Sequence, residues 1–204
     1  MLEPERYDRV YGHDLSLWER GLVFAGIDEA GRGPLLGCVV AACVVMPRTP
    51  RVPGVFDSKA LGEKQRERLY AQIAGAALFI GVGRAEAAEI DRVNILQATR
   101  LAMRRAAEGA PAPLFLVDAV GNIGLPGEER PIIRGDATSY SIAAASLVAK
   151  VTRDREMREL DARYPQYGLA RNKGYGTKEH LAALRAFGPC PEHRRSFLTG
   201  ILSP

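Results

Sequence analysis

The chain has 204 residues, 47% of them hydrophobic and 25% charged, proportions that suit one folded domain and exclude a disordered or fibrous chain. Its formal net charge is +4, a mild excess that permits an anionic partner without requiring one. Residues 1–149 carry 17 Lys and Arg against 18 Asp and Glu, so the whole basic excess lies in the last 55 residues, either as a solvated helical surface or as a footprint for a polyanion.

Two strands are predicted near the start of the chain. Residues 22–28 (LVFAGID) form an apolar run that ends in AGRGP, and residues 35–46 (LLGCVVAACVVM) are apolar and rich in β-branched side chains. Residues 62–77 have the composition of a helix, and residues 78–83 (LFIGVG) predict a third, short strand. No element is assigned to residues 1–21.

Helices and strands alternate in the middle of the chain. Helices are predicted at residues 86–91 and 94–107, the second with apolar side chains along one face. A strand at residues 114–117 runs directly into an acid, and a further short strand is predicted at residues 131–134. The longest helix spans residues 139–163, with an Ala-rich first half that is apolar enough to be buried and a charged second half.

The end of the chain is predicted to be loop and helix. Residues 164–177 form a loop, and residues 178–187 form a helix with Thr177 as its N-cap. Strands joined by helices predict an α/β domain with a mixed sheet. A small helical C-terminal lobe would then carry the basic excess.

Carboxylates end two of the predicted strands and precede the long helix. Asp28 and Glu29 follow the first strand, Asp118 follows LFLV, and Asp136 precedes the Ala-rich helix. Each has a structural alternative: a polar turn for the first pair, and an N-cap or loop acid for Asp136. Together they offer hard oxygen donors with no His or Cys in their segments, which suits Mg²⁺ or Mn²⁺ and not zinc. Two such ions about 4 Å apart would activate a water and stabilise the leaving oxygen of a phosphodiester.

Several other chemistries and locations are disfavoured. The three cysteines (Cys38, Cys43 and Cys190) lack CxxC spacing, which argues against a disulfide framework or a zinc site. No histidine lies beside a candidate nucleophile with a supporting acid, and the glycines of residues 31–37 miss the dinucleotide-binding pattern by one residue. The N-terminus is too charged for a secretory signal, and the longest apolar run is far shorter than the ~20 residues of a membrane helix. We therefore expect a cytoplasmic protein with no membrane contact.

A run of cations, glycines and one aromatic residue occupies residues 171–178 (RNKGYGTK). One interpretation is a mobile loop before a helix. The other is close approach of the backbone to a nucleic-acid strand, with Tyr175 stacking on a sugar or base and Lys173 supplying charge. The sequence HRRSF, with His193, Arg194 and Arg195, is interpreted as a basic surface patch.

Six segments, in this order, resemble the ribonuclease HII family of bacterial type 2 ribonucleases H. They are GIDEAGRGPLLG, DSKAL, NILQATRLAM, RGDATSYSIAAASLVAKVTRDREM, YPQYGLARNKGYGTKEH and HRRSF. The resemblance implies a ribonuclease H-like mixed β-sheet flanked by helices, with a small helical C-terminal extension. It divides the chain into a catalytic domain over residues 1–163 and a basic helical extension over residues 164–204, packed on the same unit.

The resemblance also assigns roles to individual residues. The family's metal-binding, catalytic acids fall on Asp28, Glu29, Asp118 and Asp136. Its residues that read the ribose 2′-OH at an RNA–DNA junction fall on Gly31, Arg32 and Gly33, and its tyrosine that recognises the same junction falls on Tyr175. Ser58 and Lys59 resemble phosphate-contacting positions. Asp154 lies mid-helix among arginines, and we interpret it as an ion-pair or structural acid.

One segment departs from the family pattern. The family usually has VDG after the strand that ends in Asp118, whereas this chain has VDAVGN, as if two residues were inserted. Asp118 is the only acid that ends this strand, so the metal-binding role stays with it. The geometry of the loop behind it does not follow from the resemblance.

The implied activity is that of a metal-dependent endonuclease. It would cleave the RNA strand of RNA/DNA hybrids and incise 5′ of single ribonucleotides in duplex DNA, leaving 3′-OH and 5′-phosphate ends. Mg²⁺ or Mn²⁺ is the expected cofactor, nucleic acid the expected partner and a monomer the expected state. Two alternatives remain: an acid-rich nuclease of the same fold that cuts all-DNA substrates, and a non-catalytic module that binds nucleic acid without metal.

Overall fold

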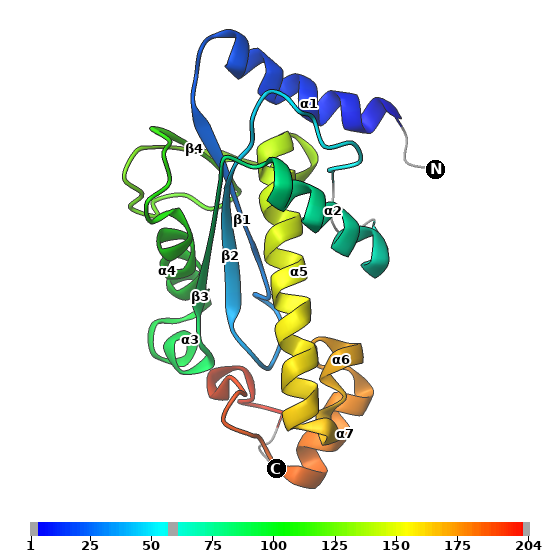
Figure 1. Cartoon of the computed structure of the whole chain (residues 1–204). Coiled ribbons are helices and arrows are strands. Elements are labelled where there is room, and N and C mark those ends of the chain that lie inside the picture. The colour runs from blue at the N-terminus through cyan, green and yellow to red at the C-terminus, as the bar shows by residue number, and fades with distance from the viewer. Residues whose placement is uncertain (1–3, 57–60, 202–204) are drawn as a thin grey trace.

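A five-stranded mixed sheet forms the centre of the protein (Figure 1). The computed structural model describes residues 4–56 and 61–201. The strand order is β3-β2-β1-β4-β5, in which β1, β2 and β3 are antiparallel while β4 and β5 run parallel to β1. The strands are β1 (Phe24–Ala30), β2 (Val39–Val45), β3 (Phe79–Ala85), β4 (Leu114–Asp118) and β5 (Glu128–Ile132). The α/β mixed sheet expected from the sequence is confirmed.

Helices cover both faces of the sheet (Figure 1). One face packs against α1 (Pro4–Glu19), α2 (Glu63–Ala76) and α5 (Tyr140–Arg163), and the other against α3 (Ala87–Val93) and α4 (Ile95–Ala107). Strand β2 contributes to both cores because successive side chains point to opposite faces. Ala42 and Val44 lie in the α5 core, whereas Ala41 and Cys43 lie in the α4 core.

Helix α5 runs along the sheet and closes one face of it (Figure 1). Its first half is buried on all sides, as its Ala-rich sequence predicts. It approaches β1 closely at Gly26, where a Cβ atom would lie 2.1 Å from the Ser141 carbonyl carbon. Only glycine fits there, and the close packing brings the side chains of α5 next to the end of β1.

The N-terminal helix and one edge strand differ from the prediction. Helix α1 occupies a segment to which the sequence assigned nothing, because its buried face (Val10, Asp14 and Leu17) includes a carboxylate. Strand β5 lies at residues 128–132 and not at 131–134, because it is an edge strand with a charged sequence (EERPI) and lacks an apolar run.

The C-terminal segment packs on the second half of α5. It contains α6 (Leu169–Asn172), α7 (Lys178–Phe187) and two short 3₁₀ turns, η3 (Pro165–Tyr167) and η4 (Arg195–Phe197). Another such turn, η2 (Gly135–Ala137), precedes α5. Thr177 caps α7 as predicted, because its hydroxyl accepts from the His180 N–H.

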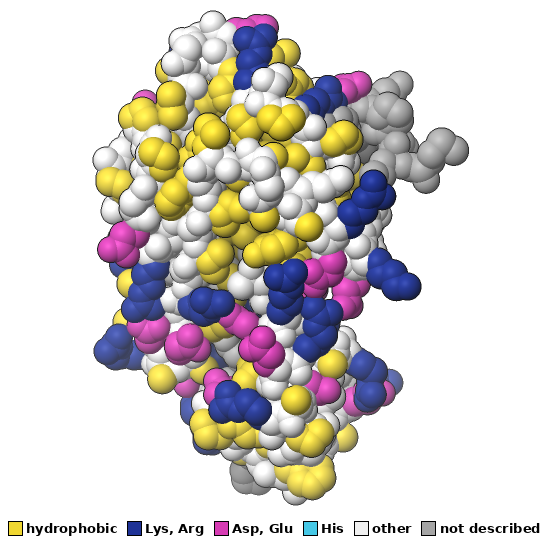
Figure 2. All heavy atoms as spheres, in the orientation of Figure 1, with side chains coloured by type: hydrophobic (Ala, Val, Ile, Leu, Met, Phe, Trp, Pro, Cys, Tyr) yellow, Lys and Arg dark blue, Asp and Glu magenta, His cyan; other side chains and the backbone are white. Residues whose placement is uncertain are grey.

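Charged side chains of both signs form a band across the face shown in Figure 2. Ion pairs tie α2 to α5: Arg155 pairs with Glu67 at 2.5 Å, and Arg158 pairs with both Glu67 and Glu63. In residues 4–56 and 61–201 no helix has the length and hydropathy to span a bilayer.

Candidate active site

Three carboxylates from separate segments meet at one edge of the sheet. Asp28 lies on β1 and Asp118 ends β4, and these neighbouring parallel strands pair at Ile27 and Val117, which places the two acids side by side. Asp136 reaches them from η2. One carboxylate oxygen from each of the three lies within 4.8 Å of the others. We call Asp28, Asp118 and Asp136 the carboxylate cluster.

The cluster is held by hydrogen bonds from the main chain. Asp28 Oδ1 accepts from the Glu29 N–H at 2.7 Å, and Asp118 Oδ1 accepts from the Gly135 N–H at 2.6 Å. The second contact fixes η2 against the end of β4, so Asp136 is positioned by the same turn that Asp118 anchors.

Glu29 lies beside the cluster but outside the 4.8 Å group. Its Oε1 is 3.3 Å from Arg32 Nη1, while its Oε2 is buried without a hydrogen-bond partner among the described residues. A buried carboxylate oxygen without a donor is costly. Such an oxygen, in a residue that lines a pocket together with Asp28 and Asp118, fits a bound cation.

Burial and the repulsion of neighbouring carboxylates favour the protonated forms of Asp28 and Glu29. Burial raises the pKa of Asp28 well above its usual value, and the charges of Glu29 and Asp118 raise it further. Burial also raises the pKa of Glu29, against which Arg32 acts in the opposite direction. A divalent cation would relieve this repulsion, and an all-oxygen donor set is the chemistry such hard cations prefer. The residues present therefore fit a divalent metal ion.

A pocket of about 520 Å³ opens over the acids. It brings together Asp28, Glu29 and Asp118 with the predicted substrate-reading residues Gly31, Arg32, Gly33 and Tyr175. Tyr175 is 48% exposed, and a Cβ atom at Gly33 would lie 3.6 Å from its ring. Lys173 does not line this pocket, and its Nζ is buried without a hydrogen-bond partner among the described residues. Ser58 and Lys59 lie outside the described residues.

The loop between β1 and β2 is held by two buried arginines. Arg194 donates to the carbonyl oxygens of residues 31, 32, 34, 37 and 38 at 2.6–3.1 Å. Arg153 donates to the carbonyl oxygens of Leu36, Cys38 and Lys173 at 3.0–3.3 Å. The predicted basic surface patch is therefore wrong for His193 and Arg194, which are 1% and 0% exposed, and holds only for Arg195.

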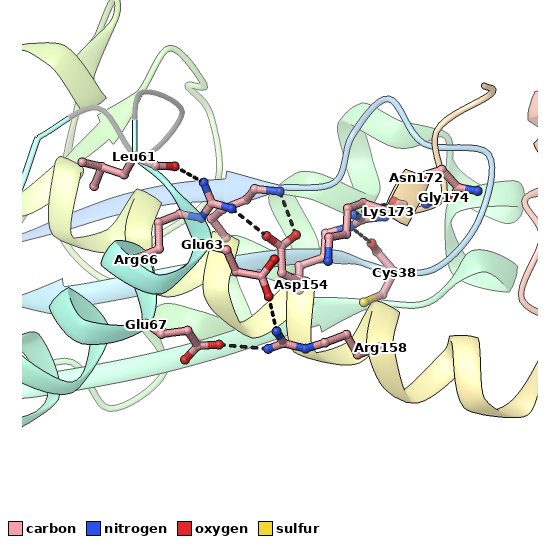
Figure 3. A network of polar contacts seen from close by, with 12 residues as sticks. Cys38, Leu61, Glu63, Arg66, Glu67, Asp154, Arg158, Asn172, Lys173 and Gly174 are labelled. Carbon is pink, nitrogen blue, oxygen red and sulfur yellow. Dashed lines mark hydrogen bonds and ion pairs between the residues drawn. The ribbon is translucent and has the colours of Figure 1, made fainter. Parts of the chain in front are cut away.

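Four residues that line the pocket were not predicted from the sequence as site residues: Arg66, Ser146, Lys150 and Arg153. Ser146 hydrogen-bonds Asp28. Asp154 accepts from Lys150 Nζ at 2.7 Å and lies 3.4 Å from Arg66 Nη2, so the expected ion-pair acid is confirmed (Figure 3). The missed signal is the spacing of four between Ser146, Lys150 and Asp154, which puts them on one face of α5.

Comparison with known proteins agrees with the fold and identifies the family. A family model described as Ribonuclease HII matches residues 25–200. Ribonuclease HII of Desulfitobacterium hafniense (strain DSM 10664 / DCB-2) is 54% identical over 200 residues, covering 97% of this chain and 77% of the relative. Ribonuclease HII of Geobacillus kaustophilus (strain HTA426) is 53% identical over 196 residues, covering 95% and 75%.

Solved structures share the fold at lower identity. Ribonuclease H2 from Pyrococcus horikoshii OT3 superposes with a TM-score of 0.75 at 27% identity, covering 88% of this chain and 97% of that one. Ribonuclease HII of Archaeoglobus fulgidus, in a complex with PCNA, gives 0.76 at 23% identity, covering 89% and 97%. Bst-RNase HIII in complex with Mn²⁺ gives 0.63 at 19% identity, covering 82% and 63%. Both the sequence match over nearly the whole chain and the fold therefore place this chain in the ribonuclease HII family, whose members are type 2 ribonuclease H endoribonucleases.

Proposed function

We propose that this enzyme cleaves the RNA strand of RNA/DNA hybrids and incises 5′ of single ribonucleotides embedded in duplex DNA, using Mg²⁺ or Mn²⁺. The observation that carries the proposal is the carboxylate cluster, beside which a buried oxygen of Glu29 has no hydrogen-bond partner among the described residues. The complex of a ribonuclease HIII of this fold with Mn²⁺ is consistent with the choice of cation.

The four acids are proposed to bind the cations. Asp28, Asp118 and Asp136 would hold the cations, with Glu29 completing the set and Arg32 restraining one of its oxygens. Cations bound there supply activation of a water and stabilisation of the leaving oxygen. The water attacks phosphorus in line and the P–O3′ bond breaks, which leaves a 3′-OH and a 5′-phosphate. No side chain becomes a covalent nucleophile.

The loop between β1 and β2 would read the ribose. The carbonyl oxygens of Gly31 and Arg32 already accept from Arg194, so the N–H groups of Gly31, Arg32 and Gly33 are the groups we assign to a 2′-OH. Tyr175 lies across from Gly33 and would stack on the sugar at the junction. Ser58, Lys59 and Lys173 are proposed to add contacts to backbone phosphates.

We also propose an organisation for the whole molecule. Residues 1–163 act as the catalytic domain, and residues 164–204 form an extension packed on the same unit. The protein acts as a cytoplasmic monomer.

A panel of matched duplexes tests the function. One carries a single ribonucleotide, one is a full RNA/DNA hybrid and one is all DNA, each incubated with Mg²⁺ or Mn²⁺. The proposal expects incision of the first two only, with the cut in the first lying 5′ of the ribonucleotide. Cutting of the all-DNA duplex would instead support a nuclease of another specificity on this fold.

Tyr175→Phe and Tyr175→Ala separate ring stacking from a role for the hydroxyl. Because stacking depends on the ring, Phe is expected to retain incision at the single ribonucleotide within a few-fold and Ala to lose about 10-fold or more. Equal activity of all three proteins on this substrate would remove Tyr175 from the proposal.

A further inference from the structure

A second hollow, of about 530 Å³, lies beside the carboxylate cluster. It is lined by Arg9, His13, Ile133, Arg134, Ala137 and Thr138, and shares no lining residue with the pocket that contains Tyr175. The turn η2 separates the two, because Asp136 of the cluster sits between Arg134 and Ala137 in the chain. We call it the α1 hollow.

Helix α1 is firmly fixed to the body of the protein. Asp14, which is fully buried, accepts from the Ser141 N–H at the start of α5 at 2.7 Å, and its other oxygen lies 2.8 Å from His13 Nδ1. The Tyr11 ring packs edge-on against Tyr140 at 5.6 Å. Arg9 and His13 are four residues apart and so lie on one face of this helix. These contacts hold Arg9 and His13 at fixed positions in the hollow.

The charge of the hollow is positive and uncompensated. Arg9 and Arg134 are exposed, and in the described part of the chain neither side chain has an ion pair or hydrogen bond. Among the described side chains, no acid lines the hollow. Three acids close to these residues in the sequence are engaged elsewhere: Asp8 pairs with Arg51, Asp14 with His13 and Ser141, and Asp136 belongs to the cluster.

The backbone at Arg134 is strained in a way that favours a functional role. Arg134 has φ 56° and ψ 45°, a left-handed conformation in which Gly or Asn is usual. Its carbonyl oxygen accepts from the Ala137 N–H at 3.0 Å and the Thr138 hydroxyl at 2.9 Å, which closes the turn. Strain of this kind concentrates at functional sites. Next to it, Ile133 is 84% exposed, an apolar side chain at the rim of a basic hollow.

We propose that the α1 hollow binds backbone phosphates of the substrate duplex next to the scissile one, with Arg9, His13 and Arg134 as the donors. This inference rests on the proposed function. A duplex strand carries a phosphate about every 3.4 Å along its axis, so a strand whose scissile phosphate lies at the cluster must bring further phosphates past η2. Ile133 would lie against the sugars of that strand. Helix α1 precedes residues 25–200, so the family match assigns it no role.

Binding and cutting are measured separately. Binding uses a labelled duplex with one ribonucleotide and proteins that all carry Asp118→Asn, so that the duplex stays intact while the Asn oxygen can still accept from Gly135. Arg9→Gln with Arg134→Gln removes both unpaired charges while keeping the side-chain stems. Arg92→Gln on α3, across the sheet, is the matched control, since Arg92 is also exposed.

The double variant is expected to bind about 5- to 20-fold more weakly at moderate salt, with the slope of log K against log salt reduced by up to about 1.8, as for two lost phosphate contacts. In the cleaving enzyme the same variant raises KM and leaves kcat within about two-fold. Shortening the duplex on one side of the ribonucleotide abolishes the difference between the variant and wild type, while shortening it on the other side preserves the difference.

Unchanged affinity and salt slope in the double variant, or the same loss in Arg92→Gln, would overturn the inference. A kcat loss without weaker binding would also overturn it. A wild-type enzyme that binds the duplex but does not cut it would contradict the proposed function instead. The two failures are therefore distinguishable.

Discussion

Arg194 determines the shape of the loop that faces the substrate. Its guanidinium group, fully buried, donates to five carbonyl oxygens of the segment between β1 and β2. Burial lowers the pKa of Arg194 to about 10, with the neighbouring charge of Arg153 acting in the same direction, and the group still carries its charge at neutral pH. Because the carbonyl oxygens of this loop are turned inward, they need a buried donor such as Arg194 to avoid the cost of unpaired polar groups.

Replacement of Arg194 should therefore cost stability and not only binding. Arg194→Gln leaves several buried carbonyls without donors and is expected to lower the free energy of unfolding by at least about 3 kcal/mol. In thermal unfolding this corresponds to a fall in Tm of about 10 °C. Arg195→Gln, at the exposed neighbouring position, is the control and should leave Tm within about 1 °C. Equal Tm values for the two variants would mean that Arg194 does not hold the loop.

Ala119 has an unfavourable backbone conformation immediately after Asp118. It is exposed and has φ 51°, in the left-handed region. Ala119→Gly should raise the free energy of unfolding by about 1 kcal/mol, because glycine adopts this conformation without steric cost. Chemical denaturation measures the change. Ala182→Gly, at an exposed position inside α7, should move stability by a similar amount in the opposite direction. Destabilisation by Ala119→Gly would contradict the backbone argument.

At the scale of elements, α7 and the segment after it are joined by a buried pair of histidines. His180 Nδ1 lies 3.0 Å from the Tyr175 carbonyl oxygen, and His180 Nε2 lies 3.1 Å from His193 Nε2. The Cys190 N–H donates to His193 Nδ1 at 3.0 Å. These contacts require both rings to be neutral: His180 protonated on Nδ1 and His193 on Nε2. Tyr175, which we place against the substrate, is thereby tied to the C-terminal segment.

Acid should loosen this contact. Burial lowers the pKa of His193 to about 4, with the charge of His180 acting in the same direction, and burial lowers the pKa of His180 as well. Below pH 6.5 these histidines bind protons in the unfolded chain but stay neutral in the folded protein. Their contribution to stability therefore falls as pH decreases from about 6.5 towards 4 and is constant above that range. For His193 the loss is on the order of 3 kcal/mol.

Denaturant unfolding at pH 7.5, 6 and 5 measures the effect. His193→Asn keeps an acceptor for the Cys190 N–H but cannot titrate, so its stability should vary less between these pH values than that of the wild type. If the free energy of unfolding changes with pH by the same amount in the two proteins, His193 is not the group responsible.

Elements with a clear apolar pattern were predictable, and those set by distant contacts were not. The strands that carry Asp28 and Asp118 and the buried half of α5 follow from continuous apolar runs. Helix α1 was missed because Asp14 interrupts its buried face, and its partner, the Ser141 N–H, is 127 residues away. Arg194 resembled surface charge because its carbonyl partners lie 156–163 residues earlier in the chain. Local sequence contains no signal for such contacts.

For the molecule as a whole, the acidic and basic groups have separate tasks. Part of the C-terminal basic excess is internal, since Arg153 and Arg194 hold the loop at the site, and other arginines pair with acids on α2. In the carboxylate cluster, burial and the charges of Glu29 and Asp118 raise the pKa of Asp28. Protons and divalent cations therefore compete for the cluster, and the cation concentration needed for half-maximal activity should fall as pH rises.

The most direct test of the account is the cation dependence of incision in wild type, Asp118→Asn and the control Glu108→Gln, on the duplex with one ribonucleotide. Glu108 is exposed at the end of α4, away from the cluster. The account predicts no incision in chelator, recovery with Mg²⁺ or Mn²⁺ in wild type and Glu108→Gln, and a loss of at least about 100-fold in Asp118→Asn, since even supporting residues of a metal site cost 10- to 100-fold. Calorimetry should show weaker cation binding in Asp118→Asn. Incision in chelator, or wild-type activity and cation binding in Asp118→Asn, would contradict it.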